Sequence, residues 1–155
     1  MKYAVGIDIG GTKIGIVIGT AKGKILARRE IPTLTGPKVK TCVQNLIKNL
    51  QSLIQQSGVS KKQILGIGVG CPGAVNTLKW ILPRSPNLPG WKGIPLRRIL
   101  HQAFKLPVFL ANDANAAAMG ELAFGAGKHS KDFIYITVST GIGGGIVING
   151  ELYEG

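Results

Sequence analysis

The sequence predicts an α/β fold built on a mixed β-sheet, and three features support that prediction. Three consecutive runs rich in Val and Ile, at residues 3–9, 14–19 and 24–31, are separated by short Gly-containing segments, as in antiparallel strands joined by tight turns. An amphipathic helix follows. Two continuous apolar runs, at residues 64–69 and 108–111, then indicate buried strands. Strands and helices in this order are typical of an α/β domain.

Three helices are predicted between and after these strands. From Val39 onward, apolar residues recur every three or four positions until Gly58, which is the pattern of an amphipathic helix with a glycine stop. A second helix is expected near residues 94–104. The Ala-rich segment 114–123 predicts a third helix that begins directly after Asn112-Asp113, which places Asp113 near its N-cap.

The last part of the chain predicts, in order, a flexible segment, a strand, a Gly-rich turn and a hairpin, at residues 125–130, 133–138, 139–145 and 146–153. Asn149-Gly150 between apolar runs is a strong hairpin signal. Because a two- or three-stranded ribbon is marginal alone, we expect these strands to open a second domain that is truncated at Gly155. The predicted domains are a first lobe at residues 1–125, and a hinge with the opening hairpin of a second lobe at residues 126–155.

Composition limits the classes of function. The chain has 155 residues, 45% of them hydrophobic and 17% charged, as in a soluble globular protein. Its net charge of +12 comes from short Lys and Arg pairs scattered over the whole chain, which favours a solvated basic surface over a nucleic-acid site. Two cysteines and two histidines without ligand spacing predict neither a disulfide framework nor a metal cluster. With no signal peptide or membrane span predicted, we expect a cytoplasmic protein.

The segment Asp8-Ile-Gly-Gly-Thr-Lys13 lies between the first two predicted strands. Two glycines there let backbone N–H groups approach a phosphate without a Cβ in the way. A carboxylate at the strand end can hold Mg²⁺ through water, and Thr12 adds a hydroxyl. The segment is not a P-loop, because Thr and Lys are in the wrong order and a strand follows. A tight hairpin with an incidental Asp is the alternative interpretation.

Ser139-Thr-Gly-Ile-Gly-Gly-Gly145 repeats the arrangement of strand, Gly-rich turn with a hydroxyl, and strand. Two such turns in one chain suggest a nucleotide held between two sheets, with its phosphates bound by backbone amides. Two further Gly-rich segments are dismissed. Gly68–Gly73 matches a dinucleotide pattern, but Pro72 and the residues after Gly73 do not open a helix. Gly125–Lys128 lacks an upstream glycine and is interpreted as an interdomain hinge.

Asn112-Asp-Ala-Asn115 marks the change from a buried strand to a helix. A helix N-terminus favours a carboxylate, so Asp113 is a candidate general base. On this segment alone, an ordinary Asp near a helix cap is an equally good interpretation.

Four motifs, in this order and spacing, resemble those of one known family: Asp8-Ile-Gly-Gly-Thr-Lys13, Pro86-Asn-Leu-Pro-Gly-Trp91, Asn112-Asp-Ala-Asn-Ala-Ala-Ala118 and Ser139-Thr-Gly-Ile-Gly-Gly-Gly145. They are similar to the ROK family of bacterial sugar kinases and sugar-responsive repressors, over the entire chain. The resemblance implies a ribonuclease-H-like fold of the actin, hexokinase and Hsp70 ATPase type. In that fold, ATP and sugar bind in the cleft between two lobes.

The resemblance also implies roles for single residues. Contacts to phosphate fall to Asp8, Gly10, Gly11, Thr12 and Lys13, and in the second turn to Thr140, Gly141, Gly143 and Gly144. Asp8 would bind Mg²⁺ through water. Sugar hydroxyls would contact Gly73, Asn87, Asn112 and Asp113, and Asp113 would take the proton from the attacking hydroxyl.

Two departures from the family pattern are visible. Asn76 stands where kinases of the family often have an acidic residue, which we interpret as a surface variation. The family's Gly-His region and its Cys-rich zinc loop would lie beyond Gly155. A structural zinc is therefore possible in the intact protein, and none is expected in this chain.

These features predict an ATP-dependent hexose kinase that transfers the γ-phosphoryl of ATP to a sugar hydroxyl, with glucose O6 as the first choice. The alternatives for the substrates are N-acetylmannosamine, N-acetylglucosamine, fructose or mannose as the sugar, and polyphosphate as the donor. We expect a homodimer when the protein is intact, an inactive 1–155 fragment, and no membrane or nucleic-acid partner.

Two rival functions stay open. A ROK-type transcriptional regulator normally has a DNA-binding helix-turn-helix before this region, and here only Met1 and Lys2 precede the first strand. An actin-like or Hsp70-like ATPase that moves partners is the second rival, against which the Asn87 and Asn112-Asp113 segments favour a sugar pocket.

Overall fold

The computed structural model describes residues 1–73, 75, 82, 85–138 and 141–154. The chain divides into two compact units, Met1–Ala111 and Asn112–Gly155. The first unit contains a five-stranded sheet in the order β3-β2-β1-β4-β5. Its strands are β1 (Tyr3–Ile9), β2 (Lys13–Thr20), β3 (Ile25–Pro32), β4 (Ile64–Cys71) and β5 (Val108–Asn112). Because β1 is antiparallel to β2 and parallel to β4, the sheet is mixed, as predicted.

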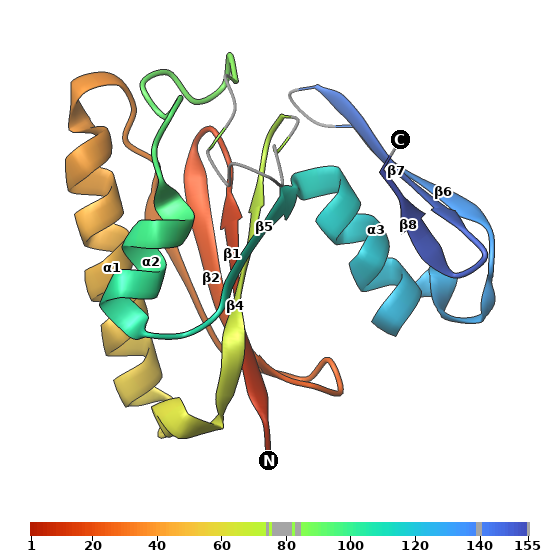
Figure 1. Ribbon diagram of the computed structural model, residues 1–155, viewed down its shortest axis with the longest axis horizontal. Coiled ribbons are helices and arrows are strands. Elements are labelled where there is room, and N and C mark those ends of the chain that lie inside the picture. The colour runs from red at the N-terminus through yellow and green to blue at the C-terminus, as the bar shows by residue number, and fades with distance from the viewer. Residues whose placement is uncertain (74, 76–81, 83–84, 139–140, 155) are drawn as a thin grey trace. The chain divides into compact units, whose positions relative to one another are not determined.

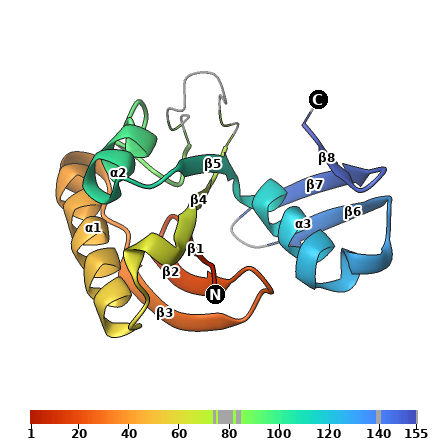
Figure 2. The same ribbon diagram turned by 60° about the horizontal axis from the view of Figure 1, so that its bottom comes forward.

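One face of this sheet is buried under two helices, α1 (Val39–Gln56) and α2 (Leu96–Phe104), as Figures 1 and 2 show. Alternate residues of each strand point to that face. Ile7 of β1, for example, is in register with Ile16 of β2 and Val69 of β4, and all three are buried. The predicted helices are confirmed, because their apolar residues at helical spacing pack on this layer. Two short 3₁₀ helices, η1 (Gly36–Lys38) and η2 (Lys61–Gln63), flank the long helix α1.

The opposite face of the sheet carries a row of small residues beside a carboxylate. Asp8 of β1 is in register with Gly15 of β2 on one side and with Gly70 of β4 on the other. Gly15 is in turn opposite Glu30 of β3. Since residues in register lie on the same face of a sheet, glycines flank Asp8 on both neighbouring strands.

The second unit is a helix packed on a three-stranded antiparallel sheet in the order β6-β7-β8. Its elements are α3 (Asp113–Phe124), the 3₁₀ helix η3 (Ala126–His129), β6 (Phe133–Val138), β7 (Ile142–Ile148) and β8 (Glu151–Tyr153). The hairpin at Asn149-Gly150 is confirmed. Both residues have positive φ, 54° and 78°, as a type I′ turn requires.

Two details of the second unit differ from the prediction. The Gly-rich turn was expected to reach Gly145, but β7 begins at Ile142, and Gly143 and Gly145 pair with β6. The reason is close packing, because a Cβ on Gly145 would lie 2.6 Å from the Cβ of Ala118 on α3. A strand can approach a helix this closely only where its side chains are absent.

Residues 125–130, expected to be a flexible segment, contain the 3₁₀ helix η3, and their flexibility stays a prediction. A carboxylate oxygen of Glu121 accepts a hydrogen bond from the Ala126 N–H at 2.8 Å, and the Ser130 N–H donates to the Gly127 carbonyl at 2.9 Å. The compact units divide before α3, whereas the lobes were expected to divide after residue 125. That division into lobes stays a prediction.

Within the part of the chain that the structure describes, no helix is both long enough and apolar enough to cross a membrane.

Candidate functional site

The turn between β1 and β2 contains the first predicted phosphate-binding motif. The Gly10 N–H donates to the Lys13 carbonyl at 3.0 Å, which closes the turn. Thr33, directly after β3, donates from its hydroxyl to the Gly10 carbonyl at 2.7 Å and from its N–H to the Thr12 carbonyl at 2.9 Å. Among the described residues, no protein group accepts a hydrogen bond from the N–H of Gly11 or Thr12. The carbonyls of Gly10, Thr12 and Lys13 are thus occupied, and two amide donors are available to an anion.

Gly11 brings this turn into contact with the predicted sugar-binding loop. A Cβ on Gly11 would lie 2.9 Å from the carbonyl oxygen of Asn87 and 3.2 Å from its Cβ. Side chains essentially never approach backbone atoms that closely, so only glycine fits at this position. Two motifs that are far apart in the sequence therefore meet within the first unit.

The loop that contains Asn87 is held by its own buried anchor. Trp91 is fully buried, and its indole N–H donates to the Leu34 carbonyl at 3.0 Å. The Gly36 N–H donates to the Pro89 carbonyl at 2.7 Å. Asn87 itself is exposed. A fixed loop with an exposed amide side chain suits recognition of sugar hydroxyls, because a carboxamide both donates and accepts hydrogen bonds.

Asp8 stands at the carboxyl end of β1 and is exposed. The two glycines in register with it leave its carboxylate approachable from the open face of the sheet. Mg²⁺ keeps most of its water ligands and takes only one or two carboxylates besides phosphate oxygens, so this setting fits the predicted water-mediated contact. Within the described residues, no three His, Cys, Asp or Glu side chains gather as a metal cage.

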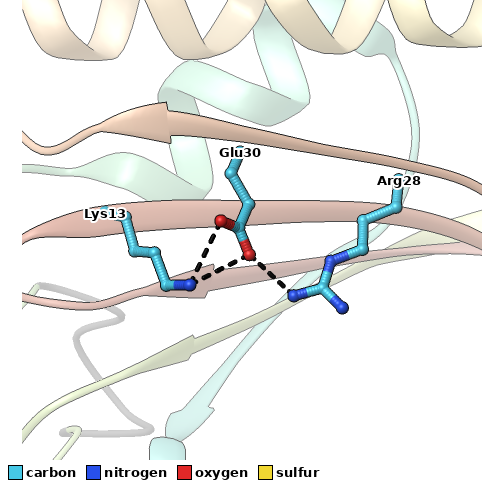
Figure 3. Close-up of polar contacts among 3 residues, drawn as sticks. All are labelled: Lys13, Arg28 and Glu30. Atoms are coloured by element: carbon cyan, nitrogen blue, oxygen red, sulfur yellow. Dashed lines mark hydrogen bonds and ion pairs between the residues drawn. The ribbon is translucent and has the colours of Figure 1, made fainter.

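Lys13 of the first motif belongs to an ion-pair network on the open face of the sheet (Figure 3). Its Nζ lies 3.1 Å from both carboxylate oxygens of Glu30, and Arg28 donates to Glu30 Oε1 at 2.6 Å. The hydrogen bonds from Arg28 and then Lys13 hold the pKa of Glu30 below its ordinary value. The ammonium group of Lys13 is thereby held beside β3, next to the turn.

Charge is divided unequally between the two units. Residues 1–111 contain 17 of the 19 Lys and Arg residues but only two acidic residues, Asp8 and Glu30. Both are at the strand ends beside the β1–β2 turn. A unit with this excess of positive charge attracts anionic ligands such as nucleotides over a long range.

The predicted base belongs to the second unit. Asn112 is the N-cap of α3, and its side-chain oxygen accepts a hydrogen bond from the Asn115 N–H at 3.1 Å. Asp113 is the first residue of the helix and is exposed. Its Oδ1 accepts a hydrogen bond from the Ala114 N–H at 2.9 Å. The cap and the candidate base are therefore separate, adjacent residues.

The glycines of the second predicted phosphate turn fall into distinct environments. Ser139 and Thr140 lie outside the described residues, as does Asn76. A Cβ on Gly141 would meet no described atom within 4 Å, so no packing contact among the described residues accounts for a glycine there. A Cβ on Gly143 would lie 3.3 Å from the Cβ of Ala114, and one on Gly144 would lie 3.1 Å from the Tyr135 carbonyl. Packing thus explains Gly143 and Gly144, while the phosphate contact of Gly141 stays a prediction.

Gly73 follows β4 and has a φ of 96°, a conformation that favours glycine. It comes two residues after Cys71, at the strand end that neighbours Asp8 through the Asp8–Gly70 register. Gly73 and the β1–β2 turn therefore follow strands that end at the same edge of the sheet. Its contact with a sugar stays a prediction.

Sequence reasoning missed the residues that hold these motifs. Thr33, Leu34 and Gly36 make the hydrogen bonds described above, yet they form no motif. A hydroxyl directly after a strand that ends beside the Gly-rich turn is the one signal that indicates Thr33. Glu30 and Arg28 were likewise not singled out, because charge pairs on neighbouring strands require the register to be known.

Comparisons with known proteins agree on one family. The model of the ROK family matches residues 4–155. The chain is 38% identical to the glucokinase of Halalkalibacterium halodurans over 99% of this chain and 46% of the relative. It is 37% identical to a putative xylose repressor of Caldicellulosiruptor sp. over 97% of this chain and 38% of that protein. The chain thus spans about half the length, or less, of the curated relatives it matches.

A solved structure gives the same picture. The ROK family glucokinase from Streptomyces griseus, in complex with glucose and AMPPNP, superimposes with a TM-score of 0.85 at 35% identity. The match covers 99% of this chain and 46% of that one. The predicted fold class, an α/β lobe of the actin and hexokinase type with a mixed sheet, is confirmed.

Proposed function

Because the chain belongs to the ROK family, we propose that it supplies the phosphate-binding turns, the sugar loop and the catalytic base of an ATP-dependent hexose kinase. Glucose is the first acceptor in this proposal, since glucokinases are among the relatives that match nearly the whole chain. Mg²⁺ as the metal, a homodimer and a cytoplasmic location belong to the same proposal.

The observation that carries the proposal is the contact between Gly11 and Asn87. A kinase must hold a phosphoryl donor and a hydroxyl acceptor next to each other, because phosphoryl transfer depends chiefly on positioning and electrostatic stabilisation. Here a turn with available amide donors touches a loop with an exposed carboxamide. A simple hairpin with an incidental aspartate does not account for that arrangement.

Each residue has a defined task in this reaction. The N–H groups of Gly11 and Thr12 bind phosphate oxygens, and Asn87 and Asn112 orient the sugar. Asp113 accepts the proton of the sugar hydroxyl as the hydroxyl oxygen attacks the γ-phosphorus.

Mg²⁺, when bound with ATP near Asp8, supplies charge neutralisation. Thr140 and Gly141 add the second phosphate turn.

One face of the sheet β6-β7-β8 is apolar and exposed, which supports the proposal that further residues contribute to the activity. The face of β6-β7-β8 turned away from α3 carries exposed apolar side chains: Ile134, Ile136, Val138, Ile142, Ile146, Ile148 and Tyr153. An apolar face of this extent is normally covered in a functioning protein. We therefore expect full activity only where other residues cover this face, and low activity from residues 1–155 alone.

The test is a coupled ADP-release assay of a protein that contains this chain, with ATP, Mg²⁺ and a panel of hexoses. Release that depends on glucose, or on another hexose of the panel, supports the proposal and names the substrate. ADP release at the same rate without any sugar favours an ATPase instead. Replacement of ATP by polyphosphate in the same assay identifies the donor.

A sugar-responsive transcriptional regulator is the second candidate, favoured by the 37% identity to the putative xylose repressor. A gel-shift titration distinguishes it from a kinase. A regulator binds one DNA sequence tightly and releases it when its sugar is added. Binding that falls steeply with salt and ignores sequence reflects only the basic surface.

A further inference from the structure

The hydroxyl of Thr33 determines which way one amide of the phosphate turn points. It donates to the Gly10 carbonyl at 2.7 Å. A trans peptide is planar, and its C=O and N–H point in opposite directions. The carbonyl of Gly10 and the N–H of Gly11 belong to one peptide group, so holding that carbonyl against Thr33 turns the N–H of Gly11 away from Thr33. The N–H of Gly11 is one of the two donors left without a protein acceptor in the described structure.

The segment of Thr33, Leu34 and Gly36 also holds the loop of Asn87. The Leu34 carbonyl accepts the indole N–H of Trp91, and the Gly36 N–H donates to the Pro89 carbonyl. The segment is itself anchored to α1, because the Leu34 N–H donates to the buried Sγ of Cys42 at 3.2 Å. One short stretch of backbone therefore contacts both motifs of the candidate site.

We propose that Thr33 is a positioning residue for phosphate binding, acting through the Gly10–Gly11 peptide. The inference rests on the proposed phosphate role of the turn. It assigns to Thr33 no contact with ligand. Its hydroxyl keeps the Gly11 donor aimed, and its segment keeps the turn in a fixed position against the Asn87 loop.

Three variants of the 155-residue chain test the proposal. Thr33→Val keeps the shape of the side chain and removes the hydroxyl, while Thr33→Ser keeps the hydroxyl. Thr35→Val is the matched control, because Thr35 lies in the same stretch, is half-buried and makes no capping hydrogen bond with its side chain. The measurements are the NMR chemical shift of the Gly11 amide, the affinity of the turn for inorganic pyrophosphate from titration of the same signals, and the hydrogen-exchange rates of amides in the centre of β1.

We expect Thr33→Val to weaken pyrophosphate binding about fivefold, which corresponds to the ~1 kcal/mol of one hydrogen bond. It should also shift the Gly11 signal, whereas Thr33→Ser and Thr35→Val stay close to the wild type. A loss of general stability does not produce this pattern, because exchange in the centre of β1 would then rise as well.

An equal Gly11 chemical shift and equal pyrophosphate affinity in Thr33→Val and the wild type overturn the positioning role. A wild-type chain whose turn signals do not respond to pyrophosphate contradicts the proposed phosphate site instead. In that case the Gly11 chemical shift in Thr33→Val still decides whether Thr33 orients the peptide.

Discussion

The carbonyl oxygen of Asn87 occupies the space that a Cβ on Gly11 would need, at a distance of 2.9 Å. Gly11→Ala must therefore push the Asn87 loop away from the turn or move the turn itself. We expect a loss of about 1–3 kcal/mol in the free energy of unfolding of the first unit, as for other overpacked sites. Urea unfolding followed by Trp fluorescence measures it, because both tryptophans lie in residues 1–111.

Gly68→Ala is the matched control for Gly11→Ala. Gly68 is on the exposed face of β4, and a Cβ there would lie 3.9 Å from the Val5 carbonyl, an ordinary contact. We expect unchanged or slightly raised stability from this variant. A Gly11→Ala protein as stable as Gly68→Ala, with an unchanged Asn87 signal, would show that the turn and the loop are not in contact.

A second pair of glycines separates packing from ligand binding in the second unit. Gly145→Ala puts a methyl group 2.6 Å from the Cβ of Ala118, so we expect faster amide hydrogen exchange throughout α3. The methyl group of Gly141→Ala meets no described atom within 4 Å and should leave that exchange unchanged. In a protein with sugar-dependent ADP release, Gly141→Ala should instead raise the KM for ATP. Unchanged KM in Gly141→Ala would remove Gly141 from the phosphate site.

The sequence predicted the strands and helices better than it predicted why glycines occupy particular positions. Apolar runs rich in Val and Ile identified β1 to β4, and apolar residues at helical spacing identified α1. Gly143 and Gly145 were assigned to a turn, since no local pattern shows that Ala114 and Ala118 of α3 pack against them. Thr33 was missed for a similar reason. Its partners Gly10 and Thr12 lie in the β1–β2 turn, and only the register between β2 and β3 brings them next to Thr33.

Asp113 and Asn112 have separable roles, which two variants distinguish. Asp113→Asn keeps the size of the side chain and removes the base, so turnover should fall by ~10²-fold or more while α3 keeps its stability. Asn112→Ala removes the cap bond to Asn115 and should cost about 1 kcal/mol of stability in the second unit. ADP release measures the first effect, and hydrogen exchange in α3 measures the second. Wild-type turnover in Asp113→Asn would exclude Asp113 as the base.

The Lys13–Glu30–Arg28 network predicts a pH response that can be assigned to one carboxylate. Hydrogen bonds from Arg28 and Lys13 favour the ionised form of Glu30 and lower its pKa, so the small stabilisation they give is present near neutral pH. It disappears as the pH falls through the pKa of Glu30 in the folded protein. We expect Arg28→Gln to raise that pKa toward the ordinary value, and the Arg28→Gln/Lys13→Gln pair to raise it further. NMR titration of the Glu30 side-chain carboxyl carbon measures both.

Arg29→Gln is the control for this titration, because it removes the same charge from the next residue. The Arg29 side chain bonds to Asn49 and Gln56 of α1, on the helix-covered face, and does not contact Glu30 in the described structure. We therefore expect the pKa of Glu30 to stay near the wild-type value in Arg29→Gln. An equal rise in Arg29→Gln and Arg28→Gln would mean that net charge, not the Arg28 hydrogen bond, lowers the pKa.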